Sequence, residues 1–562
     1  MRTLRGMTEH APMTDPALTD PAPTDAAAAL GQPPRRPTVR EACFRLLRAF
    51  GIDTVFGNPG STELPMFRDF PEDFRYVLGL QESVVVGMAD GYAQRQRNAA
   101  LVNLHSAVGV GHAMGNIFTA FKNQTPLLIT AGQQSRAILP FDPFLGSTQA
   151  TELPKPYVKW SCEPARAEDV PLALARAYYI AMQVPQGPVL VSIPADDWDR
   201  PTDWVEPRQV SRQVAPAPAD LAAVAEALNR CRRPAFVVGA GVDRDQAMDA
   251  VVQLAERHRA AVFTAPMSAR CGFPESHPQF GGFLPALRER IVERLQGHDL
   301  VLVLGAPAFI YHVEGQGPHL PAGAELLQLV DDPQLAAWTP VGRSVVGSLQ
   351  LAVPALLALT QAPERALPPP RPATPVAEPG PGPMGTAFAL QTLARLRPAD
   401  SVVVEEAPGA RSVMQACLPM HGPDSFHTMA SGGLGHGMPA AVGVALALRR
   451  QGSAQRVIAL IGDGSSLYSI QALWTAAQLQ LPITFVILNN RRYAALQDFA
   501  PVFGYPVGHK PAGTELPDLD FVLLARGQGL AGRRVDHARD LADELALALA
   551  HDGPCLIELQ VQ

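Results

Sequence analysis

The stretch that decides the fold is "IALIGDGSSLYSIQALWTAAQLQLPITFVILNNRRYAALQDF", Ile458 to Phe499. It opens with an apolar run that stops at Gly-Asp-Gly-Ser, and a second apolar run near its end stops at Asn-Asn. A helical pattern, "SIQALWTAAQL", lies between the two runs. Apolar runs without strict alternation are typical of parallel strands that are buried on both faces. The stretch therefore predicts a strand–helix–strand unit of a parallel sheet.

The same alternation recurs along the chain. The runs "PAFVVGAG", "DLVLVLGAP" and "AELLQLVDD" are short and apolar, and helical patterns such as "ADLAAVAEALNRC" lie between runs of this kind. We therefore expect an α/β fold with doubly wound parallel sheets. A short internal sequence similarity links "TAFKNQTPLLIT" (119–130) with "TAAQLQLPITFVI" (475–487). It indicates that the first and third domains share a topology.

Proline-rich stretches and one weaker break divide the chain. "MTDPALTDPAPTD" lies near the N-terminus, and "PERALPPPRPATPVAEPGPGPMG" begins at Pro363. The first is typical of disorder and the second of a stiff, exposed linker. We predict a disordered leader (1–37), an N-terminal domain (38–200), a middle domain (215–360), a linker (361–385) and a C-terminal domain (386–562).

Composition excludes several classes of protein. The formal charge of −7 on 562 residues is small and argues against a nucleic-acid-binding protein, which needs a basic face. The six cysteines are scattered without a C-x-x-C pair, which argues against a zinc site or a disulfide framework. Neither a membrane span nor a secretory signal is predicted, because no long apolar run is present. We therefore expect a cytoplasmic protein without nucleic-acid or membrane partners.

One acid and one amide, Asp463 and Asn490, end the two strands of the opening stretch. Ligands of parallel sheets bind beyond the carboxyl ends of the strands. Carboxylate and amide oxygens suit Mg²⁺, whose other positions are filled by backbone oxygen, water and phosphate. Gly462 and Gly464 let the backbone approach closely, and the following helix N-terminus favours an anion. The pair predicts a magnesium–diphosphate clamp; the alternative is a helix-capping Asp and a turn Asn.

The order G-D-G-S, about twenty-five residues, and then N-N resembles the signature of thiamine diphosphate-dependent enzymes. Over almost the whole chain from Thr38, the sequence is similar to the 2-oxo acid decarboxylases of this family, nearest to the benzoylformate decarboxylase branch. The segments that carry the resemblance are "GIDTVFGNPGSTELPMFRDFPEDFRYVLGLQE", "VNLHSAVGVGHAMGN", "TAGQQSRA", "GPVLVSIPADDWD" and "SLYSIQALWTAAQ". The resemblance implies pyrimidine-binding, middle and diphosphate-binding domains, in that order.

The resemblance also implies the cofactors, thiamine diphosphate and Mg²⁺, and the residues that hold them. Asp463, Asn490 and the backbone carbonyl of Arg492 match the metal ligands, although Arg491 stands where the family commonly has glycine. Glu82, in "VLGLQESVVVGMADGYAQ", matches the glutamate that activates the cofactor through its aminopyrimidine. The other expected cofactor contacts are Gly432, Leu434, Gly462, Gly464, Ser465 and Tyr493.

Four side chains match the catalytic residues of the family: Ser61, Glu82, His105 and His277. The implied reaction is the non-oxidative conversion of a 2-oxo acid to an aldehyde and carbon dioxide. Such a reaction requires protons to be given and taken near neutral pH, which histidine can do in both directions. Ser61 is expected to contact the substrate carboxylate. Without the resemblance, each histidine reads as a satisfied core residue or an exposed loop residue.

The substrate pocket matches the family less well. Phe144 stands where a leucine is expected, and Thr428 where an aromatic residue is expected. "EEAPGARS" (405–412) lacks a run of Ser and Thr, and Pro408 and Gly409 supply no side-chain hydroxyls. We therefore expect benzoylformate to be turned over less well than another 2-oxo acid. The expected pocket residues are Ser61, Phe144, Leu145, Thr428, Leu496 and Phe499.

In this family the pyrimidine and the diphosphate are held by different subunits. The resemblance thus implies a homodimer or homotetramer with active sites at the subunit interface. Two alternatives are an acetolactate synthase-like carboligase on the same fold and a non-catalytic protein that keeps the cofactor fold. A nicotinamide-dependent oxidoreductase is a third, because "VVGAGVDRD" at Val237 resembles a dinucleotide turn, but the full G-x-G-x-x-G is missing.

Overall fold

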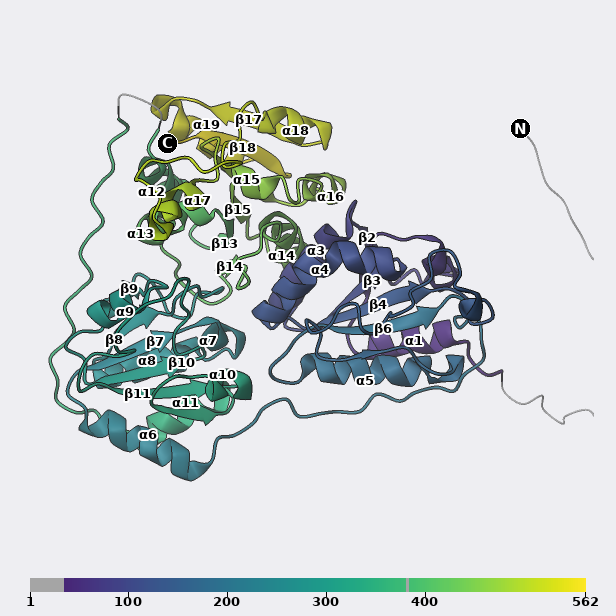
Figure 1. Ribbon diagram of the computed structural model, residues 1–562, viewed down its shortest axis with the longest axis horizontal. Helices are drawn as coiled ribbons and strands as arrows, with labels where there is room; N and C mark the ends of the chain where they lie inside the picture. Colours follow the sequence, from purple (N-terminus) through teal and green to yellow (C-terminus); the bar gives the residue numbers. More distant parts are fainter. Residues whose placement is uncertain (1–34, 381–383) are drawn as a thin grey trace, which may run out of the picture.

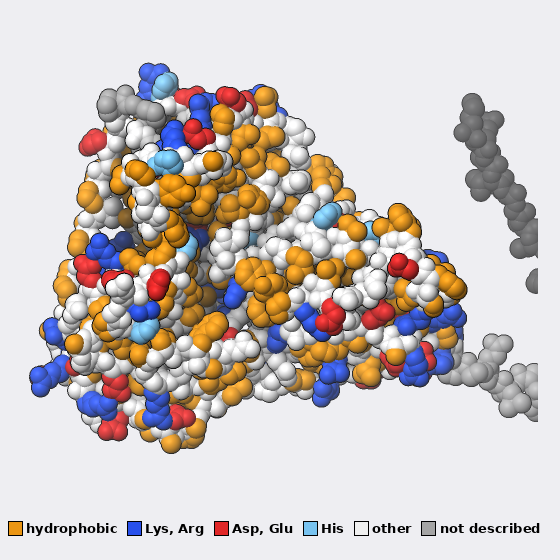
Figure 2. Space-filling model, in the orientation of Figure 1, with side chains coloured by type: hydrophobic (Ala, Val, Ile, Leu, Met, Phe, Trp, Pro, Cys, Tyr) orange, Lys and Arg blue, Asp and Glu red, His pale blue; other side chains and the backbone are white. Residues whose placement is uncertain are grey.

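The computed structural model describes residues 35–380 and 384–562, so the predicted leader lies almost wholly outside the described residues. The chain forms three lobes, each built on its own sheet (Figure 1). Each sheet has six strands, and all of the pairings between the strands are parallel. The predicted α/β, doubly wound architecture is confirmed. The lobes meet around a hollow that is visible in the space-filling view (Figure 2).

The N-terminal sheet has the order β2-β1-β3-β4-β6-β5. Its strands are β1 (Thr54–Gly57), β2 (Arg75–Leu78), β3 (Ala100–Leu104), β4 (Leu127–Gln133), β5 (Ser161–Cys162) and β6 (Val189–Pro194). Its helices are α1 (Val39–Ala49), α2 (Leu64–Phe67), α3 (Glu82–Gln96), α4 (Ser106–Asn123) and α5 (Val170–Met182). The central strands β1, β3 and β4 are buried along their whole length, as parallel strands covered on both faces must be.

The middle sheet has a different order, β12-β11-β10-β7-β8-β9. Its strands are β7 (Pro234–Val238), β8 (Ala261–Thr264), β9 (Phe280–Phe283), β10 (Leu300–Leu304), β11 (Glu325–Val330) and β12 (Arg343–Val346). Its helices are α6 (Pro218–Arg230), α7 (Ala240–Arg244), α8 (Met248–His258), α9 (Arg288–Arg294), α10 (Pro333–Ala337) and α11 (Leu349–Leu359). The three strands predicted from "PAFVVGAG", "DLVLVLGAP" and "AELLQLVDD" are β7, β10 and β11 and are confirmed.

The C-terminal sheet has the order β14-β13-β15-β16-β18-β17. Its strands are β13 (Val402–Glu406), β14 (Phe426–Thr428), β15 (Val457–Gly462), β16 (Ile483–Asn489), β17 (Ala531–Val535) and β18 (Cys555–Gln560). Its helices are α12 (Thr386–Leu396), α13 (Arg411–Cys417), α14 (Gly437–Arg450), α15 (Asp463–Ser466), α16 (Ala472–Leu479), α17 (Ala494–Phe499), α18 (Phe521–Gly527) and α19 (Leu541–Leu549). None of the helices in the described residues is both long and apolar enough to cross a membrane.

The first and third sheets share one topology. Numbered from its own first strand, each sheet has the order second, first, third, fourth, sixth, fifth. The internal sequence similarity between residues 119–130 and 475–487 falls on equivalent elements, because α4 leads into β4 as α16 leads into β16. The predicted shared topology is therefore confirmed. The opening stretch forms β15, α16 and β16, and Gly462 pairs with Leu488 at the carboxyl end of this strand pair.

Helices α3 and α14 join the N- and C-terminal domains and lie side by side (Figure 1). Glycines allow their backbones to touch. A Cβ atom on Gly443 would lie 1.9 Å from the carbonyl oxygen of Met88, and one on Gly91 would lie 2.2 Å from that of Ala440. A side chain of any size would force the helices apart at these positions. The two domains that resemble each other thus pack through equivalent helices, each of which follows the second strand of its sheet.

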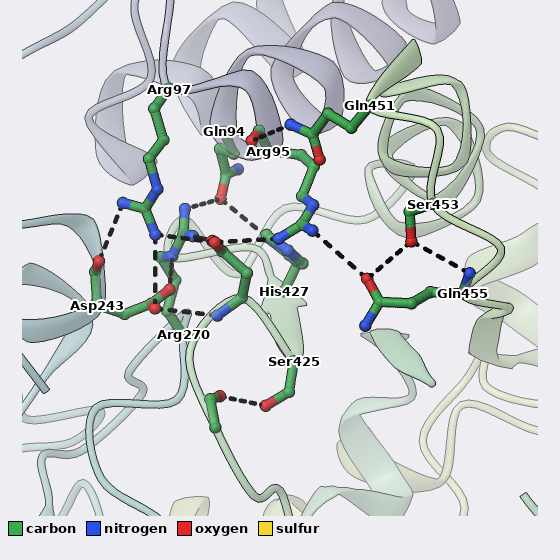
Figure 3. Close-up of polar contacts among 12 residues, drawn as sticks. Gln94, Arg95, Arg97, Asp243, Arg270, Ser425, His427, Gln451, Ser453 and Gln455 are labelled. Carbon is green, nitrogen blue, oxygen red and sulfur yellow. Dashed lines mark hydrogen bonds and ion pairs between the residues drawn. The ribbon is translucent and has the colours of Figure 1, made fainter. Parts of the chain in front are cut away.

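A buried charge cluster joins all three domains (Figure 3). Arg270 of the middle domain pairs with Asp243 and with Asp424 of the C-terminal domain. Arg97, from the end of α3, lies 2.9 Å from the Asp424 carboxylate. Gln94 of α3 bonds both Arg270 and His427. This three-domain junction fixes β14, whose last residue precedes the loop with the predicted cofactor contacts.

The predicted linker forms neither helix nor strand over 361–380, and near its end Met384 forms an isolated bridge with Val561. It runs along the outside of the molecule from the middle to the C-terminal domain (Figure 1). Arg365 is an anchor within it, since its buried guanidinium donates to the backbone oxygens of Cys231 and Leu228.

Candidate active site

Three of the four predicted catalytic residues follow neighbouring strands of the N-terminal sheet. Ser61 begins a 3₁₀ turn (Ser61–Glu63) after β1, Glu82 begins α3 after β2, and His105 directly follows β3. Strands β2, β1 and β3 are adjacent and parallel. Their carboxyl ends therefore meet at one edge of the sheet, and the structure brings these three residues to that edge.

Glu82 is available to a ligand because it does not cap its helix. The side chain of Gln81 caps α3 instead, accepting hydrogen bonds from the N–H groups of Ser83 and Val84. The Glu82 side chain is 12% exposed, and its carboxylate lies 3.2 Å from Nδ1 of His112.

His105 is held by a buried carboxylate that the sequence analysis missed. Its Nδ1 lies 2.8 Å from Glu63 and 3.0 Å from the Thr62 hydroxyl. Glu63 is 1% exposed and also accepts the N–H of Gly60 at 2.8 Å. Gly60 packs against the imidazole, because a Cβ atom there would lie 2.3 Å from Nδ1. The sequence signal was an acid two residues after the predicted substrate serine, in "NPGSTELP".

Asp463 and Asn490 lie together at the carboxyl ends of β15 and β16, as the opening stretch predicts. The N–H of Asn490 donates to the Asp463 carboxylate at 3.2 Å. Asp463 is 4% exposed, and burial raises the pKa of its carboxyl although nearby backbone N–H groups oppose the shift. Among the described residues it has no cationic side-chain partner within ion-pair distance. A buried acid without a counter-charge, beside an amide oxygen, fits the donor set of a divalent cation.

The loop after Asn490 accommodates the unusual arginine. Arg491 has φ +60°, in the left-handed region that glycine adopts most readily. The N–H of Arg492 donates to the side-chain oxygen of Asn490 at 3.2 Å, which orders the loop. Gly464 is required on the facing turn, because a Cβ atom there would lie 2.3 Å from the Tyr493 ring. The loop that would present the Arg492 carbonyl is thus formed in this sequence.

The glycine-rich loop after β14 is tied to β13 by Glu406. Gly432 has φ +73° and is exposed, and Leu434 is half-buried. The Glu406 carboxyl, fully buried, accepts the N–H groups of Gly435 at 2.7 Å and of His436 at 2.8 Å. Burial raises the pKa of Glu406 to about 7. Ser465, in α15, is also buried near this edge of the sheet.

His277 is not brought to the other predicted residues. It precedes β9, at the amino end of a strand, and its Nε2 lies 3.3 Å from Glu256 on α8. A different histidine, His312, follows β10 and stacks on Phe499 with ring centroids 4.5 Å apart and planes 8° apart. Within one chain, His312 and not His277 therefore lies beside the predicted pocket residue Phe499. The place of His312 after a predicted strand could have singled it out, because ligands bind beyond the carboxyl ends of parallel strands.

The apolar pocket residues come from two domains. Leu496 and Phe499 lie on α17, and Leu496 is 57% exposed. Phe144 and Leu145 lie in the loop after β4 of the N-terminal domain. The Phe144 ring is 85% exposed, so most of its surface remains open to a further contact.

Thr428 does not line open space, although it was expected among the pocket residues. It is 0% exposed, and its hydroxyl donates to the backbone oxygen of Glu405 at 2.7 Å. Arg411 lies against it, with Nη2 2.7 Å from the Thr428 hydroxyl and 2.6 Å from the Glu405 carboxylate. Thr428 thus supports Arg411, which lines a cavity between the middle and C-terminal domains.

Comparison with known proteins agrees with this geometry. Family models of thiamine pyrophosphate (diphosphate) enzymes match residues 37–152 (N-terminal TPP binding domain), 221–356 (central domain) and 409–559 (C-terminal TPP binding domain). A benzoylformate decarboxylase of Pseudomonas aeruginosa is 45% identical over 93% of this chain and 99% of its own.

Solved structures give the same result. Benzoylformate decarboxylase from Polynucleobacter necessarius is 40% identical with a TM-score of 0.91, covering 93% of this chain and 98% of its own. A thiamine diphosphate-dependent 4-hydroxybenzoylformate decarboxylase of Rhodococcus jostii is 40% identical with a TM-score of 0.89, covering 94% and 99%. The chain therefore belongs to the thiamine pyrophosphate enzyme family, as a decarboxylase of the benzoylformate decarboxylase type.

Proposed function

We propose that the protein converts an aromatic 2-oxo acid to an aldehyde and carbon dioxide, using thiamine diphosphate and Mg²⁺. One observation carries the proposal: two sheets of identical strand order present complementary groups at their carboxyl ends. The N-terminal sheet presents Ser61, Glu82 and His105, and the C-terminal sheet presents Asp463 and Asn490. The first set suits proton transfer and carboxylate binding, and the second suits a metal-bound diphosphate.

Asp463, Asn490 and the Arg492 carbonyl would hold Mg²⁺, with the backbone around Gly462 and Ser465 against the diphosphate. When bound, thiamine diphosphate would supply a nucleophilic carbon and an acceptor for the electron pair that remains when carbon dioxide leaves. Glu82 would hold a proton at the aminopyrimidine, since its carboxyl is only 12% exposed and is free of the helix cap. Gly432 and Leu434 would shape the cofactor site between them.

The chain's own groups account for the remaining proton transfers. Ser61, exposed at the rim, would orient the substrate carboxylate. His105 would exchange a proton with the substrate oxygen, while Glu63 fixes the orientation of its ring. His312, beside Phe499, would serve the other side of the reacting carbon.

We further propose a homodimer or homotetramer in which each active site lies between subunits. Phe144, a pocket residue of the N-terminal domain, is 85% exposed in the single chain, and Leu496 of the C-terminal domain is 57% exposed. Large apolar side chains exposed beside functional residues are typical of surfaces that a partner covers. A second copy of this chain would cover both.

A panel of 2-oxo acids tests the proposed function. Purified protein would be loaded with thiamine diphosphate and Mg²⁺ and given benzoylformate, ring-substituted benzoylformates, phenylpyruvate and a branched aliphatic 2-oxo acid. We expect aldehyde and carbon dioxide in equal amounts, with benzoylformate turned over but not preferred. Formation of an acetohydroxy acid from pyruvate would instead support a carboligase, and absence of any turnover with bound cofactor would refute the proposal.

A further inference from the structure

Arg411 lies at the edge of the candidate pocket. The role assigned to it below rests on the function proposed above. Arg411 begins α13, directly after the turn Pro408–Ala410 that follows β13. Its side chain is 13% exposed. An arginine this well buried beside an apolar pocket has been positioned by specific contacts, because its desolvation is costly.

Those contacts form a closed cluster at the ends of two neighbouring strands. Arg411 Nη2 lies 2.6 Å from the Glu405 carboxylate and 2.7 Å from the Thr428 hydroxyl. The Thr428 hydroxyl lies 2.9 Å from the same carboxylate, and the N–H of Ala407 donates to its other oxygen at 2.6 Å. Glu405 is 0% exposed, so the ion pair is shielded from water. The arginine is neutralised and its orientation is fixed.

The cluster leaves donors of Arg411 unused. Within the described part of the chain, all of its hydrogen bonds use Nη2. Nε also has no partner, but it is closed to solvent, so Nη1 is the unbonded donor that remains open. An unpaired N–H in a largely buried side chain is costly, and an acceptor supplied by a ligand in the cavity would engage Nη1.

Arg411 lines a cavity of about 290 Å³ between the middle and C-terminal domains. Most of the other side chains around this cavity are apolar, among them Phe283, Leu284 and Met414. The lining carboxyl, Glu275, has its pKa raised to about 8 by burial, so it is an uncharged acid at neutral pH. Arg270, which also lines the cavity, is paired with Asp243 and Asp424. The cavity therefore offers Arg411 no free counter-anion.

The cavity adjoins the candidate substrate pocket. Ala286 lines it, and the Ala286 carbonyl oxygen accepts the backbone N–H of His312 at 2.9 Å. The His312 ring stacks on Phe499. On the other side, Pro408 lines the cavity, and a Cβ atom on the next residue, Gly409, would lie 3.3 Å from Ala494, the first residue of α17. The cavity with Arg411 thus lies next to the elements that carry His312 and Phe499.

We infer that Arg411 is a specificity-determining residue that donates hydrogen bonds to an uncharged oxygen at the far end of an aromatic 2-oxo acid. A neutral acceptor suits the site better than a second carboxylate, because Glu405 already neutralises the guanidinium. The substrate class is thus a benzoylformate with a ring hydroxyl or ether oxygen opposite its 2-oxo acid group. A purely hydrocarbon ring would leave Nη1 without an acceptor.

The test compares 4-hydroxybenzoylformate with 4-methylbenzoylformate, which has a similar shape but no acceptor. We expect wild type, loaded with cofactor, to prefer the hydroxyl compound in kcat/KM. In Glu405→Gln/Arg411→Met, which removes both charges, the preference falls by roughly 10- to 100-fold. Glu405→Gln alone is the matched control, because it keeps the guanidinium and therefore most of the preference. Arg411→Lys, which keeps the charge but lacks a second terminal nitrogen, also lowers the preference.

Binding of 4-hydroxymandelate and 4-methylmandelate, which lack the 2-oxo group, is measured by calorimetry on the same proteins. The ratio of their affinities reports on the pocket independently of turnover. A wild type without preference for the hydroxyl compounds overturns the assignment of Arg411, as does a folded, cofactor-loaded double variant or Arg411→Lys variant with the wild-type ratio. Normal binding ratios without turnover of any 2-oxo acid would refute the proposed reaction and leave the assignment of Arg411 intact.

Discussion

The imidazole of His312 lies face to face with the ring of Phe499, with centroids 4.5 Å apart and planes inclined by 8°. The two residues belong to different domains, so the stack fixes the middle domain against α17 at the substrate pocket. His277, the histidine selected from the sequence, contacts Glu256 on the outer helix α8 instead. The two histidines can be distinguished by experiment.

Replacing His312 tests its part in proton transfer. His312→Phe keeps an aromatic ring on Phe499 but removes the titratable group, so we expect kcat to fall by roughly 10²- to 10⁴-fold. His277→Asn is the control, and its kcat should stay within a few-fold of wild type. Steady-state kinetics with the best substrate of the panel decides between them. A large loss in His277→Asn with near-normal His312→Phe would restore the assignment made from the sequence.

Glu63 is expected to act through His105. Glu63→Gln keeps the shape and one acceptor but removes the charge 2.8 Å from Nδ1. Hydrogen bonds to charged groups contribute about 1.5–3 kcal/mol, so kcat should fall by about 10- to 150-fold. Thermal unfolding and cofactor affinity of the variant should remain close to wild type. Unchanged kcat in Glu63→Gln would show that the carboxylate does not assist His105.

Asp463 is expected to determine cofactor retention. Asp463→Ala removes the buried carboxylate of the metal clamp, and we expect Mg²⁺-dependent binding of thiamine diphosphate to be lost in isothermal titration. Asp400→Ala, at an exposed acid before β13, is the control and should bind normally. Equal affinities in the two variants would mean that the clamp is misplaced.

Glu82 is expected to affect activation of the cofactor but not its binding. Glu82→Gln keeps the shape of the side chain and removes its acid. Cofactor affinity should change little, while hydrogen exchange at the reactive carbon, followed by NMR, should slow by roughly 10²- to 10⁴-fold. An exchange rate equal to that of wild type would remove Glu82 from this role.

His427 makes stability fall in acid. Burial, reinforced by the nearby charge of Arg270, lowers its pKa from 6.5 to about 3 in the three-domain junction. Between these two values the unfolded chain takes up a proton that the folded chain does not, so stability decreases as the pH falls below about 6.5. At pH 5.5 this single group costs about 1.4 kcal/mol.

Urea unfolding at pH 7.5 and pH 5.5 measures the effect. His427→Gln should lose less stability on acidification than wild type, whatever its stability at pH 7.5. His509→Gln, at an exposed histidine, should lose as much as wild type. Parallel behaviour of all three proteins would exclude His427 as the source of the pH dependence.

The elements that depend on local pattern could be read from the sequence. Asp463 and Asn490 were predictable because each ends an apolar run, and the carboxyl ends of neighbouring parallel strands must meet. Ser61, Glu82 and His105 follow strands in the same way. The shared topology of the first and third sheets could also be predicted, from the internal sequence similarity between the segments that form α4–β4 and α16–β16.

Contacts between distant segments could not be read in this way. Nothing in the local pattern shows that Arg411 fills space beside Thr428, because the two residues are 17 positions apart and meet only across β13 and β14. Thr428 and the segment 405–412 depart from the family pattern at two separate places in the sequence. In the structure they form one hydrogen-bonded cluster. His277 was selected because its motif matched, whereas its place at the amino end of β9 of its own chain became evident only from the fold.

The glycine contacts between α3 and α14 set an order of events during synthesis. Gly91 and Gly443, which let these helices touch, are 352 residues apart in the chain. At about 5–20 residues per second, a ribosome needs roughly 20–70 s to make the intervening chain. The first domain, which ends near residue 200, is therefore complete while its docking helix α3 still lacks its partner. The first and third domains can pack together only late in synthesis, and a chain truncated before α14 would expose α3 to chaperones and proteases.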